Sequence, residues 1–245
     1  MIRDFSGNDY ENQLEEALIN ILSNGSKSLH QIINFFELLD SPKIESPQLQ
    51  EEYEISNRKI HIIKTSKDLE IAVKSMKTTP FLGFDSEQRP TFTKGEKSHG
   101  ISIIQLANES DCYIFQIKQI NNIKPILSLL EDDKIIKVGT GLKGDKDELY
   151  NQFKVKLKST IDLEEVFNKL SAKQAIGAKR SASMFLNKNL QKSKRMSRSN
   201  WENKELSSGQ IKYAAEDATV VYDVISSVIK QYPFIMRVMP KFFKI

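Results

Sequence analysis

Short apolar runs in the middle of the chain predict a series of β-strands. Each run is four to six residues long, rich in Ile, Val and Phe, and bounded by polar residues, glycine or proline, which is typical of buried strands. The predicted strands are "KIHIIK", 81–85, 101–106, 112–116 and 134–138. The third and fourth of these are close enough to form a hairpin.

Apolar residues at helical spacing alternate with these strands. They predict helices at 66–78, at 122–131 and over "SSGQIKYAAEDATVVYDVISSVIKQY" near the end. Strands alternating with helices indicate an α/β domain with a mixed sheet flanked by helices. We place this domain at residues 58–232.

The flanking segments have a different character. Residues 1–40 contain two leucine- and isoleucine-rich helical stripes and predict a small N-terminal helical pair of unknown role. Residues 41–57 hold prolines and acids and predict a linker. Residues 233–245 form a basic, apolar tail. Because an apolar stripe usually packs against something, we expect the helical pair to serve packing, self-association or a protein partner.

Two acids follow the run Phe81–Phe84 in "FLGFDSEQRP". On a strand, residues i and i+2 face the same side, so Asp85 and Glu87 would project together with Ser86 pointing away. Neighbouring carboxylates repel, and a bound Mg²⁺ or Mn²⁺ is a physical reason to keep them. A solvated pair at the end of a strand is the alternative.

A third acid lies in "KVGTGLKGDKDELY", where a strand, a glycine-rich turn and a helix follow one another. Asp145 would lie at the start of that helix, either as its N-cap or as part of a site. The spacing of the glycines matches neither a P-loop nor a dinucleotide-binding turn, which argues against a nucleotide-binding fold.

The last acid, Asp217, follows Tyr213 by one helical turn in the C-terminal helix, so the two share a face. Asp217 would complete a metal cluster. A phenol has a pKa near 10 and is a poor base at neutral pH, so Tyr213 would orient the attacking water. The alternative is an exposed acid and a half-buried tyrosine. Four acids and a tyrosine are what a two-metal phosphodiesterase needs.

Charge is unevenly distributed over the 245 residues, whose net charge is +4. Residues 1–57 have a net charge of −8 and residues 58–245 one of +12, and nine Lys/Arg lie between Glu165 and Glu202 with no acid among them. Such a run is either a solvated face or a surface that contacts phosphates. The candidate nucleic-acid contacts are Lys194, Arg195 and Arg198, with Phe92 and Trp201 as stacking residues. A core position is the alternative for Trp201.

Composition excludes several classes of protein. Cys112 is the one cysteine, so no internal disulfide can form, and it does not group with the three histidines into a zinc site. No apolar stretch reaches 18 residues, and the N-terminus is too acidic for a signal peptide. We expect no membrane association and a cytoplasmic location, or a nuclear one in a eukaryote.

The three acid-bearing segments, in this order, resemble the DEDD superfamily of 3′–5′ exonucleases and its DEDDy branch, which includes the Werner syndrome exonuclease domain and the ribonuclease D group. The likeness covers roughly residues 59–231 and extends beyond the acids. It is carried by "GFDSEQRPTFTKGEKSHGISIIQLA", "IIKVGTGLKGDKDELYNQFKVKLKSTIDLEEV" and "LNKNLQKSKRMSRSNWENKELSSGQIKYAAEDATVVYDVI".

The resemblance implies a ribonuclease H-like fold and release of nucleoside 5′-monophosphates from DNA or RNA that is single-stranded or has a 3′ overhang. It implies two divalent cations, Mg²⁺ or Mn²⁺. Asp85, Glu87 and Asp217 would hold the first, and Asp85 would share the second with Asp145, directly or through water. Tyr213 would orient the nucleophilic water. All five positions carry the expected residues.

One segment departs from the family pattern. "SAKQAIGAKRSASMFLNKNL" lacks the usual leucine-rich helix and holds Lys179, Arg180 and Ser181 instead, which concerns packing and not chemistry. A nucleic-acid-binding adaptor that uses the same fold without turnover is the alternative function, and the complete set of acids argues against it.

Overall fold

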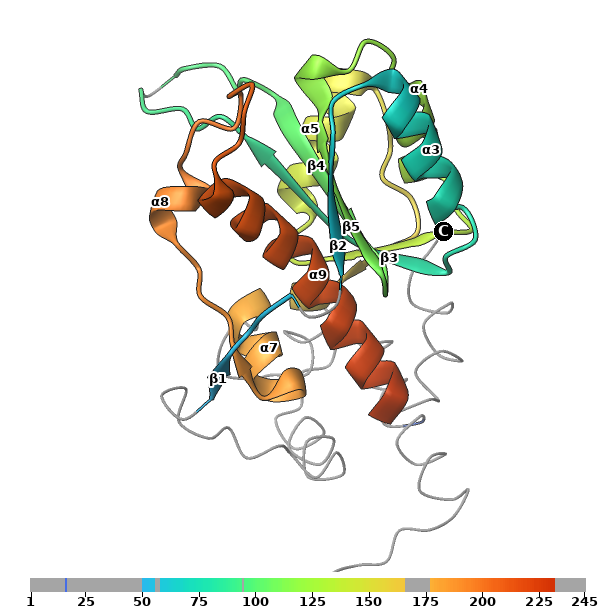
Figure 1. The fold of residues 1–245 in the computed structure, drawn as a ribbon, viewed down its shortest axis with the longest axis vertical. Coiled ribbons are helices and arrows are strands. Elements are labelled where there is room, and N and C mark those ends of the chain that lie inside the picture. Colours follow the sequence, from blue (N-terminus) through green and yellow to red (C-terminus); the bar gives the residue numbers. More distant parts are fainter. Residues whose placement is uncertain (1–15, 17–49, 56–57, 94, 166–176, 232–245) are drawn as a thin grey trace, which may run out of the picture.

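A six-stranded mixed sheet forms the centre of the molecule in the computed structural model, which describes residues 16, 50–55, 58–93, 95–165 and 177–231 (Figure 1). The strands lie in the order β2-β5-β4-β3-β6-β7. Their bounds are Lys59–Ile63 (β2), Phe81–Gln88 (β3), Ile101–Ala107 (β4), Asp111–Gln116 (β5), Ile136–Gly139 (β6) and Thr160–Asp162 (β7). Strands β3, β4 and β5 are antiparallel, β2 lies parallel to β5, and β6 and β7 continue parallel to β3. The predicted mixed sheet and hairpin are confirmed.

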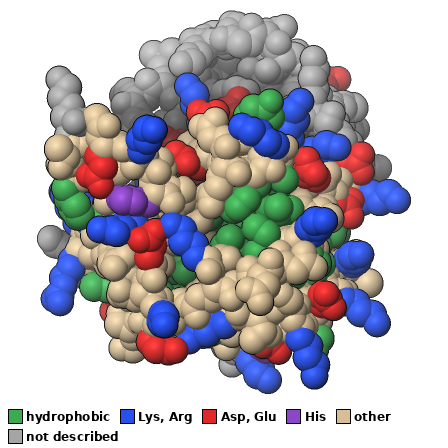
Figure 2. All heavy atoms as spheres, turned by 90° about the horizontal axis from the view of Figure 1, so that it is seen from above, with side chains coloured by type: hydrophobic (Ala, Val, Ile, Leu, Met, Phe, Trp, Pro, Cys, Tyr) green, Lys and Arg blue, Asp and Glu red, His purple; other side chains and the backbone are tan. Residues whose placement is uncertain are grey.

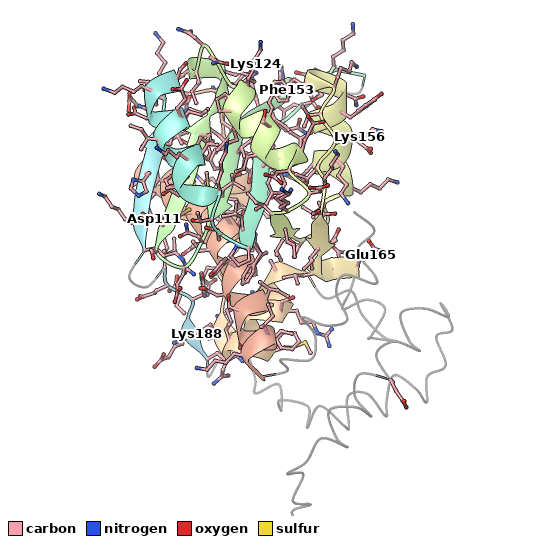
Figure 3. All side chains as sticks on the ribbon, turned by 90° about the vertical axis from the view of Figure 1, so that its right-hand side faces the viewer. Asp111, Lys124, Phe153, Lys156, Glu165 and Lys188 are labelled. Atoms are coloured by element: carbon pink, nitrogen blue, oxygen red, sulfur yellow. The ribbon has the colours of Figure 1, made fainter. Side chains whose placement is uncertain are left out.

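Helices cover both faces of this sheet (Figures 1 and 3). On one face lie α3 (Ser66–Met76), α4 (Lys124–Glu131) and α5 (Lys143–Phe153), and on the other lies α9 (Ser208–Gln231). Strand alternation divides the core between the two faces. Ile104 and Leu106 of β4 belong to the first layer, and Ile103 and Ala107 belong to the layer beneath α9.

Shorter elements connect β7 to α9. Those in the described residues of this connection are α7 (Ala178–Leu186), β8 (Lys188–Asn189) and α8 (Lys194–Ser197), and a 3₁₀ turn, η2 (Ile117–Gln119), follows β5. The helix that departs from the family pattern, α7, packs against α9 with Ser181 and Ala182 buried. Small buried side chains allow the two helices to approach without the leucines of the family pattern.

Several predicted element bounds differ from the structure by one to three residues. The strand at 81–85 continues to Gln88, the helix at 66–78 ends at Met76, and the helix at 122–131 begins at Lys124, with Pro125 in its first turn. The last difference follows from proline chemistry, since proline lacks the amide hydrogen that a helix interior requires and is accepted at its start.

The end of the predicted linker is docked onto the domain. Glu51–Glu52 form β1, which pairs in parallel with β8. Tyr53 is buried, and its hydroxyl donates to Asp223 Oδ2 at 2.7 Å and lies 3.1 Å from Thr219 Oγ1 on α9. The folded unit therefore starts before residue 58. The helical pair, most of the linker and the tail at 233–245 lie outside the described residues.

Among the helices that the structure describes, none is both long and apolar enough to cross a membrane.

Candidate active site

The first two acids of the site face α9 from the end of β3. Strand alternation places Leu82 and Phe84 in the core beneath α3–α5, so Asp85 and Glu87 point to the opposite side, as predicted. Close packing of helix on strand holds them there. A Cβ atom added to Gly83 would lie 2.0 Å from the carbonyl oxygen of Ala218, so only glycine admits α9 at this distance.

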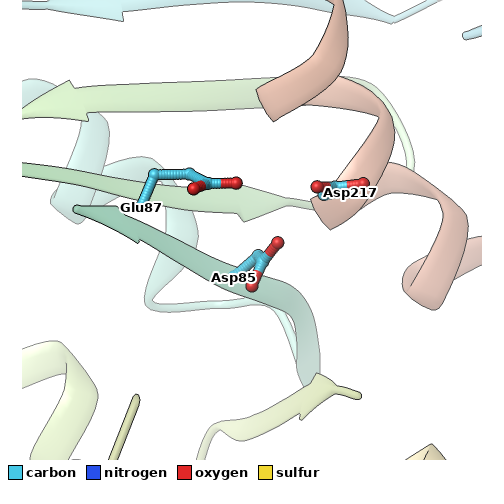
Figure 4. A group of neighbouring side chains, drawn as sticks. All are labelled: Asp85, Glu87 and Asp217. Atoms are coloured by element: carbon cyan, nitrogen blue, oxygen red, sulfur yellow. The ribbon is translucent and has the colours of Figure 1, made fainter. Parts of the chain in front are cut away.

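Helix α9 places Asp217 beside these two acids. The helix begins with a capping box, in which the Ser207 hydroxyl accepts from the Gln210 amide at 3.2 Å and Gln210 Oε1 accepts from the Ser207 amide at 3.1 Å. Two turns later Asp217 is 5% exposed, next to the contact with β3. Carboxylate oxygens of Asp85, Glu87 and Asp217 lie within 4.8 Å of one another and point together (Figure 4).

Asp145 lies beside this cluster on the other side of β3. It stands in the first turn of α5, and its Oδ1 accepts a hydrogen bond from the Ser86 hydroxyl. It does not cap the helix, because it is the third residue of α5, whose N-cap position is Leu142. Asp162 accepts from the amides of Gly141 and Leu142, just before the helix, at 2.9 and 2.8 Å. Its negative charge contributes to raising the pKa of Asp85. The structure thus brings all four acids to one end of β3, three in a tight group and Asp145 adjacent.

The group is electrostatically strained. Burial, followed by repulsion from Asp217 and Asp145, raises the pKa of Asp85 well above its ordinary value. Burial and the charge of Asp85 raise the pKa of Glu87 to about 9, and burial also raises the pKa of Asp217. Carboxylates arranged in this way favour a bound cation. Three hard oxygen donors of one charge suit Mg²⁺ or Mn²⁺.

Lys192 is a member of the site that sequence reasoning missed. Its ammonium pairs with Asp217 Oδ1 and lies 5.4 Å from the centre of the Tyr213 ring. Burial lowers the pKa of Lys192, but the charges of Asp217, Asp85 and Glu87 outweigh burial, and the pKa is raised. Lys192 belongs to the basic run between Glu165 and Glu202, yet nothing in its spacing distinguishes it from the other lysines there.

Tyr213 lies on α9 one turn before Asp217, with its ring 6.1 Å from that of Trp201. Burial, then the charges of Asp217 and Glu87, raises the pKa of its hydroxyl. The phenol therefore stays protonated at neutral pH, which agrees with a positioning role and argues against proton abstraction.

Trp201 is a core residue, which corrects its prediction as a stacking residue. It is 1% exposed, packs with Ile103 and Ala214 beneath α9, and its indole NH donates to the Ser197 carbonyl at 3.4 Å. The open alternative for this residue, an anchor between loop and helix, is the one that the structure supports. A side chain that is buried in the core has no face free for a base.

The other predicted contacts lie on the surface. Phe92 is 79% exposed in the loop after β3, while Lys194 and Arg195 on α8 and the following Arg198 are exposed. On the face that Figure 2 presents, Lys and Arg side chains are interspersed with acids and do not form one continuous basic patch. Contact of these residues with nucleic acid stays a prediction.

Known proteins share both the sequence pattern and the fold. A family model described as 3′-5′ exonuclease matches residues 60–232. The mouse "Bifunctional 3'-5' exonuclease/ATP-dependent helicase WRN" is 38% identical over 140 residues, which are 56% of this chain and 10% of that protein. The chain thus spans a small part of that relative's length.

Two solved structures show the same fold. The Nibbler exonuclease domain of Aedes aegypti has a TM-score of 0.65 at 19% identity, over 80% of this chain and 99% of that one. Trypanosoma brucei RNase D, in its complex with RNA U12, has a TM-score of 0.60 at 17% identity, over 75% and 70% of the two chains. These neighbours confirm the ribonuclease H-like fold, and the family model decides the family. The chain belongs to the DnaQ-like 3′–5′ exonuclease family, with WRN and RNase D among its relatives.

Proposed function

We propose that this chain is a metal-dependent 3′–5′ exonuclease of the DEDDy type, which hydrolyses the terminal phosphodiester of DNA or RNA and releases nucleoside 5′-monophosphates. The convergence of Asp85, Glu87 and Asp217 from a strand and a distant helix supports this proposal most directly. A group of buried, mutually repelling carboxylates lowers stability unless a ligand compensates it, so its presence favours catalysis over a purely structural role.

The donor set fits two divalent cations. Asp85, Glu87 and Asp217 would hold one, and Asp145 with Asp85 would hold the other, since all are hard oxygen ligands. When bound, the cations supply Lewis-acid activation of water and stabilise the leaving oxygen of an in-line displacement.

The remaining residues position the reactants. The protonated Tyr213 hydroxyl would orient the attacking water, whose oxygen bonds to phosphorus as the bond from phosphorus to the 3′-oxygen breaks. The 3′-oxygen leaves as a hydroxyl after taking up a proton. Lys194, Arg195 and Arg198 would bind phosphates of the strand, and Phe92 would stack on a base. Relatives named for a helicase and for an RNA complex make DNA and RNA both candidate substrates.

The test is degradation of 5′-labelled 3′-overhang DNA and of matched RNA, each with Mg²⁺, Mn²⁺ or EDTA. Wild type should shorten one or both strands stepwise from the 3′ end only with metal. Asp85→Asn should abolish the ladder. Tyr213→Phe should slow it about 10²-fold, the scale of losing one preorganised hydrogen-bond donor, with strand binding retained.

An intact strand in every metal, with binding retained by wild type, would reject the enzyme and support the adaptor function. A ladder that persists in Asp85→Asn would show that the activity does not come from this site.

A further inference from the structure

Lys192 is held at the carboxylate cluster from three sides. Leu190, two residues before it, is 1% exposed and anchors the loop in the core. Ser193, directly after it, caps α8 by accepting from the Met196 amide at 3.3 Å. The aromatic ring of Tyr213 lies beneath the ammonium at 5.4 Å. Because the loop is fixed before and after Lys192, its ammonium stays close to Asp217. The side chain is 34% exposed.

The ammonium and a divalent cation would use the same carboxylate. Lys192 pairs with Asp217 Oδ1, and Asp217 is one of the three acids whose oxygens lie within 4.8 Å of one another. One carboxylate cannot pair with a close ammonium and coordinate a cation at full strength, because the two positive charges repel at such a distance. Occupancy of the Asp217 carboxylate is therefore an exchange between Lys192 and metal.

We propose that Lys192 is the resident counterion of the cluster: it neutralises Asp217 until a divalent cation displaces it, and its ammonium then turns to a phosphate oxygen of the bound strand. The inference rests on the proposed function for its second half only. The first half concerns metal binding by the protein alone.

Charge and reach favour the phosphate as the new partner. Lys192 lies at the start of the exposed basic stretch that continues through Lys194, Arg195 and Arg198. Its four-carbon stem carries a point charge that can swing between partners without moving the anchored backbone. The scissile phosphate brings negative charge into the site. An ammonium displaced from Asp217 would therefore pair with this phosphate.

The test compares the full-length wild type with Lys192→Met, which keeps an apolar stem and removes the charge, and with Lys192→Arg, which keeps the charge. Calorimetric titration with Mn²⁺ in the absence of nucleic acid should show about tenfold tighter binding to Lys192→Met. The melting temperature of this variant in EDTA should fall, since the cluster has lost its counterion. Lys192→Arg should stay near wild type in both measurements.

Lys194→Met is the matched control for metal affinity, because it removes the same charge from an exposed lysine two residues further on. It should leave the Mn²⁺ affinity within about twofold of wild type, since solvent screens exposed charges.

Strand cleavage by Lys192→Met should change in the opposite direction to its metal binding. This variant should bind Mn²⁺ more tightly than wild type, yet its kcat/KM should fall.

Unchanged or weaker Mn²⁺ binding by Lys192→Met overturns the inference, as does an equal effect of Lys194→Met. The proposed function has a separate outcome. A stepwise ladder with unchanged metal affinities rejects the counterion alone, whereas tighter Mn²⁺ binding without any ladder retains the counterion and rejects the exonuclease. No Mn²⁺ binding by either protein contradicts both.

Discussion

At the scale of single residues, two aromatic side chains with the same predicted role have opposite surroundings. Trp201 fills the core beneath α9 with 1% of its surface exposed, whereas Phe92 is 79% exposed in a loop. Both types of ring stack on bases, so residue chemistry does not separate them. Burial does, because a ring in the core contributes to stability and a ring in solvent is free to bind.

We expect Trp201→Ala to lower the free energy of unfolding by about 3–5 kcal/mol, the usual cost of emptying a large buried site. Urea denaturation measures this. Strand affinity of the folded variant should be unchanged. Phe92→Ala is the counterpart. Its unfolding free energy should stay within about 0.5 kcal/mol of wild type. Its strand affinity should drop by about 1–3 kcal/mol, the value typical of one stacked base, which raises the measured Kd about fivefold or more. If Trp201→Ala instead lowered strand affinity and left stability unchanged, Trp201 would be a nucleic-acid-binding residue.

At the scale of elements, the crossing of α9 over β3 builds the site. Asp85 and Glu87 are close in sequence, but Asp217 joins them only because the helix backbone lies directly on Gly83. Burial of Ala214, Ala215 and Ala218 keeps the helix low on the sheet, since alanine side chains add little thickness. The assembly of the three carboxylates therefore depends on this one contact between α9 and β3.

Gly83→Ala should lower the free energy of unfolding by about 3 kcal/mol or more, because the added methyl group meets the Ala218 carbonyl and one backbone must move. Mn²⁺ affinity of the variant should fall as Asp217 moves away. Gly144→Ala is the control: nothing lies within 4 Å of its added Cβ, and alanine favours the α5 helix by about 0.5–1 kcal/mol. Equal stability of the two variants would show that the contact tolerates expansion.

At the scale of the whole molecule, repulsion among buried acids makes stability depend on pH and metal. Five carboxyl groups among the described residues have a raised pKa: Glu87 at about 9, Glu216 at about 7, and Asp85, Asp145 and Asp217. Between the ordinary pKa of these groups and the raised one, the folded state binds more protons than the unfolded state. Stability therefore falls as pH rises through this window.

We expect the melting temperature in EDTA to fall steadily from pH 5 to pH 9, as measured by calorimetry at constant ionic strength. Lys137, whose pKa burial lowers to about 8, opposes this trend only above that pH. Saturating Mg²⁺ should raise the melting temperature and flatten the slope, because bound cations stabilise the ionised carboxylates. Glu87→Gln should reduce the slope in EDTA. A melting temperature that is constant or rising over this range would contradict the buried-acid cluster.

The sequence by itself determined the order of strands and helices along the chain, and on which of these elements the four acids and Tyr213 lie. These depend on local rules, namely alternation along a strand and the 3.6-residue turn of a helix, which also explain why Ser86 points away from Asp85. The acids were identifiable as a set because each of the three segments that carry them has its own pattern, and the family resemblance links the three segments.

Only the tertiary structure decided which residues meet across the chain. The pairing of Lys192 with Asp217, the hydrogen bond from Ser86 to Asp145, the burial of Trp201 and the docking of Glu51–Tyr53 all join segments distant in sequence or depend on how they pack. Local propensity carries no information on such contacts, because their free energy comes from burial and charge that exist only once α9 and its connecting loop lie on the sheet.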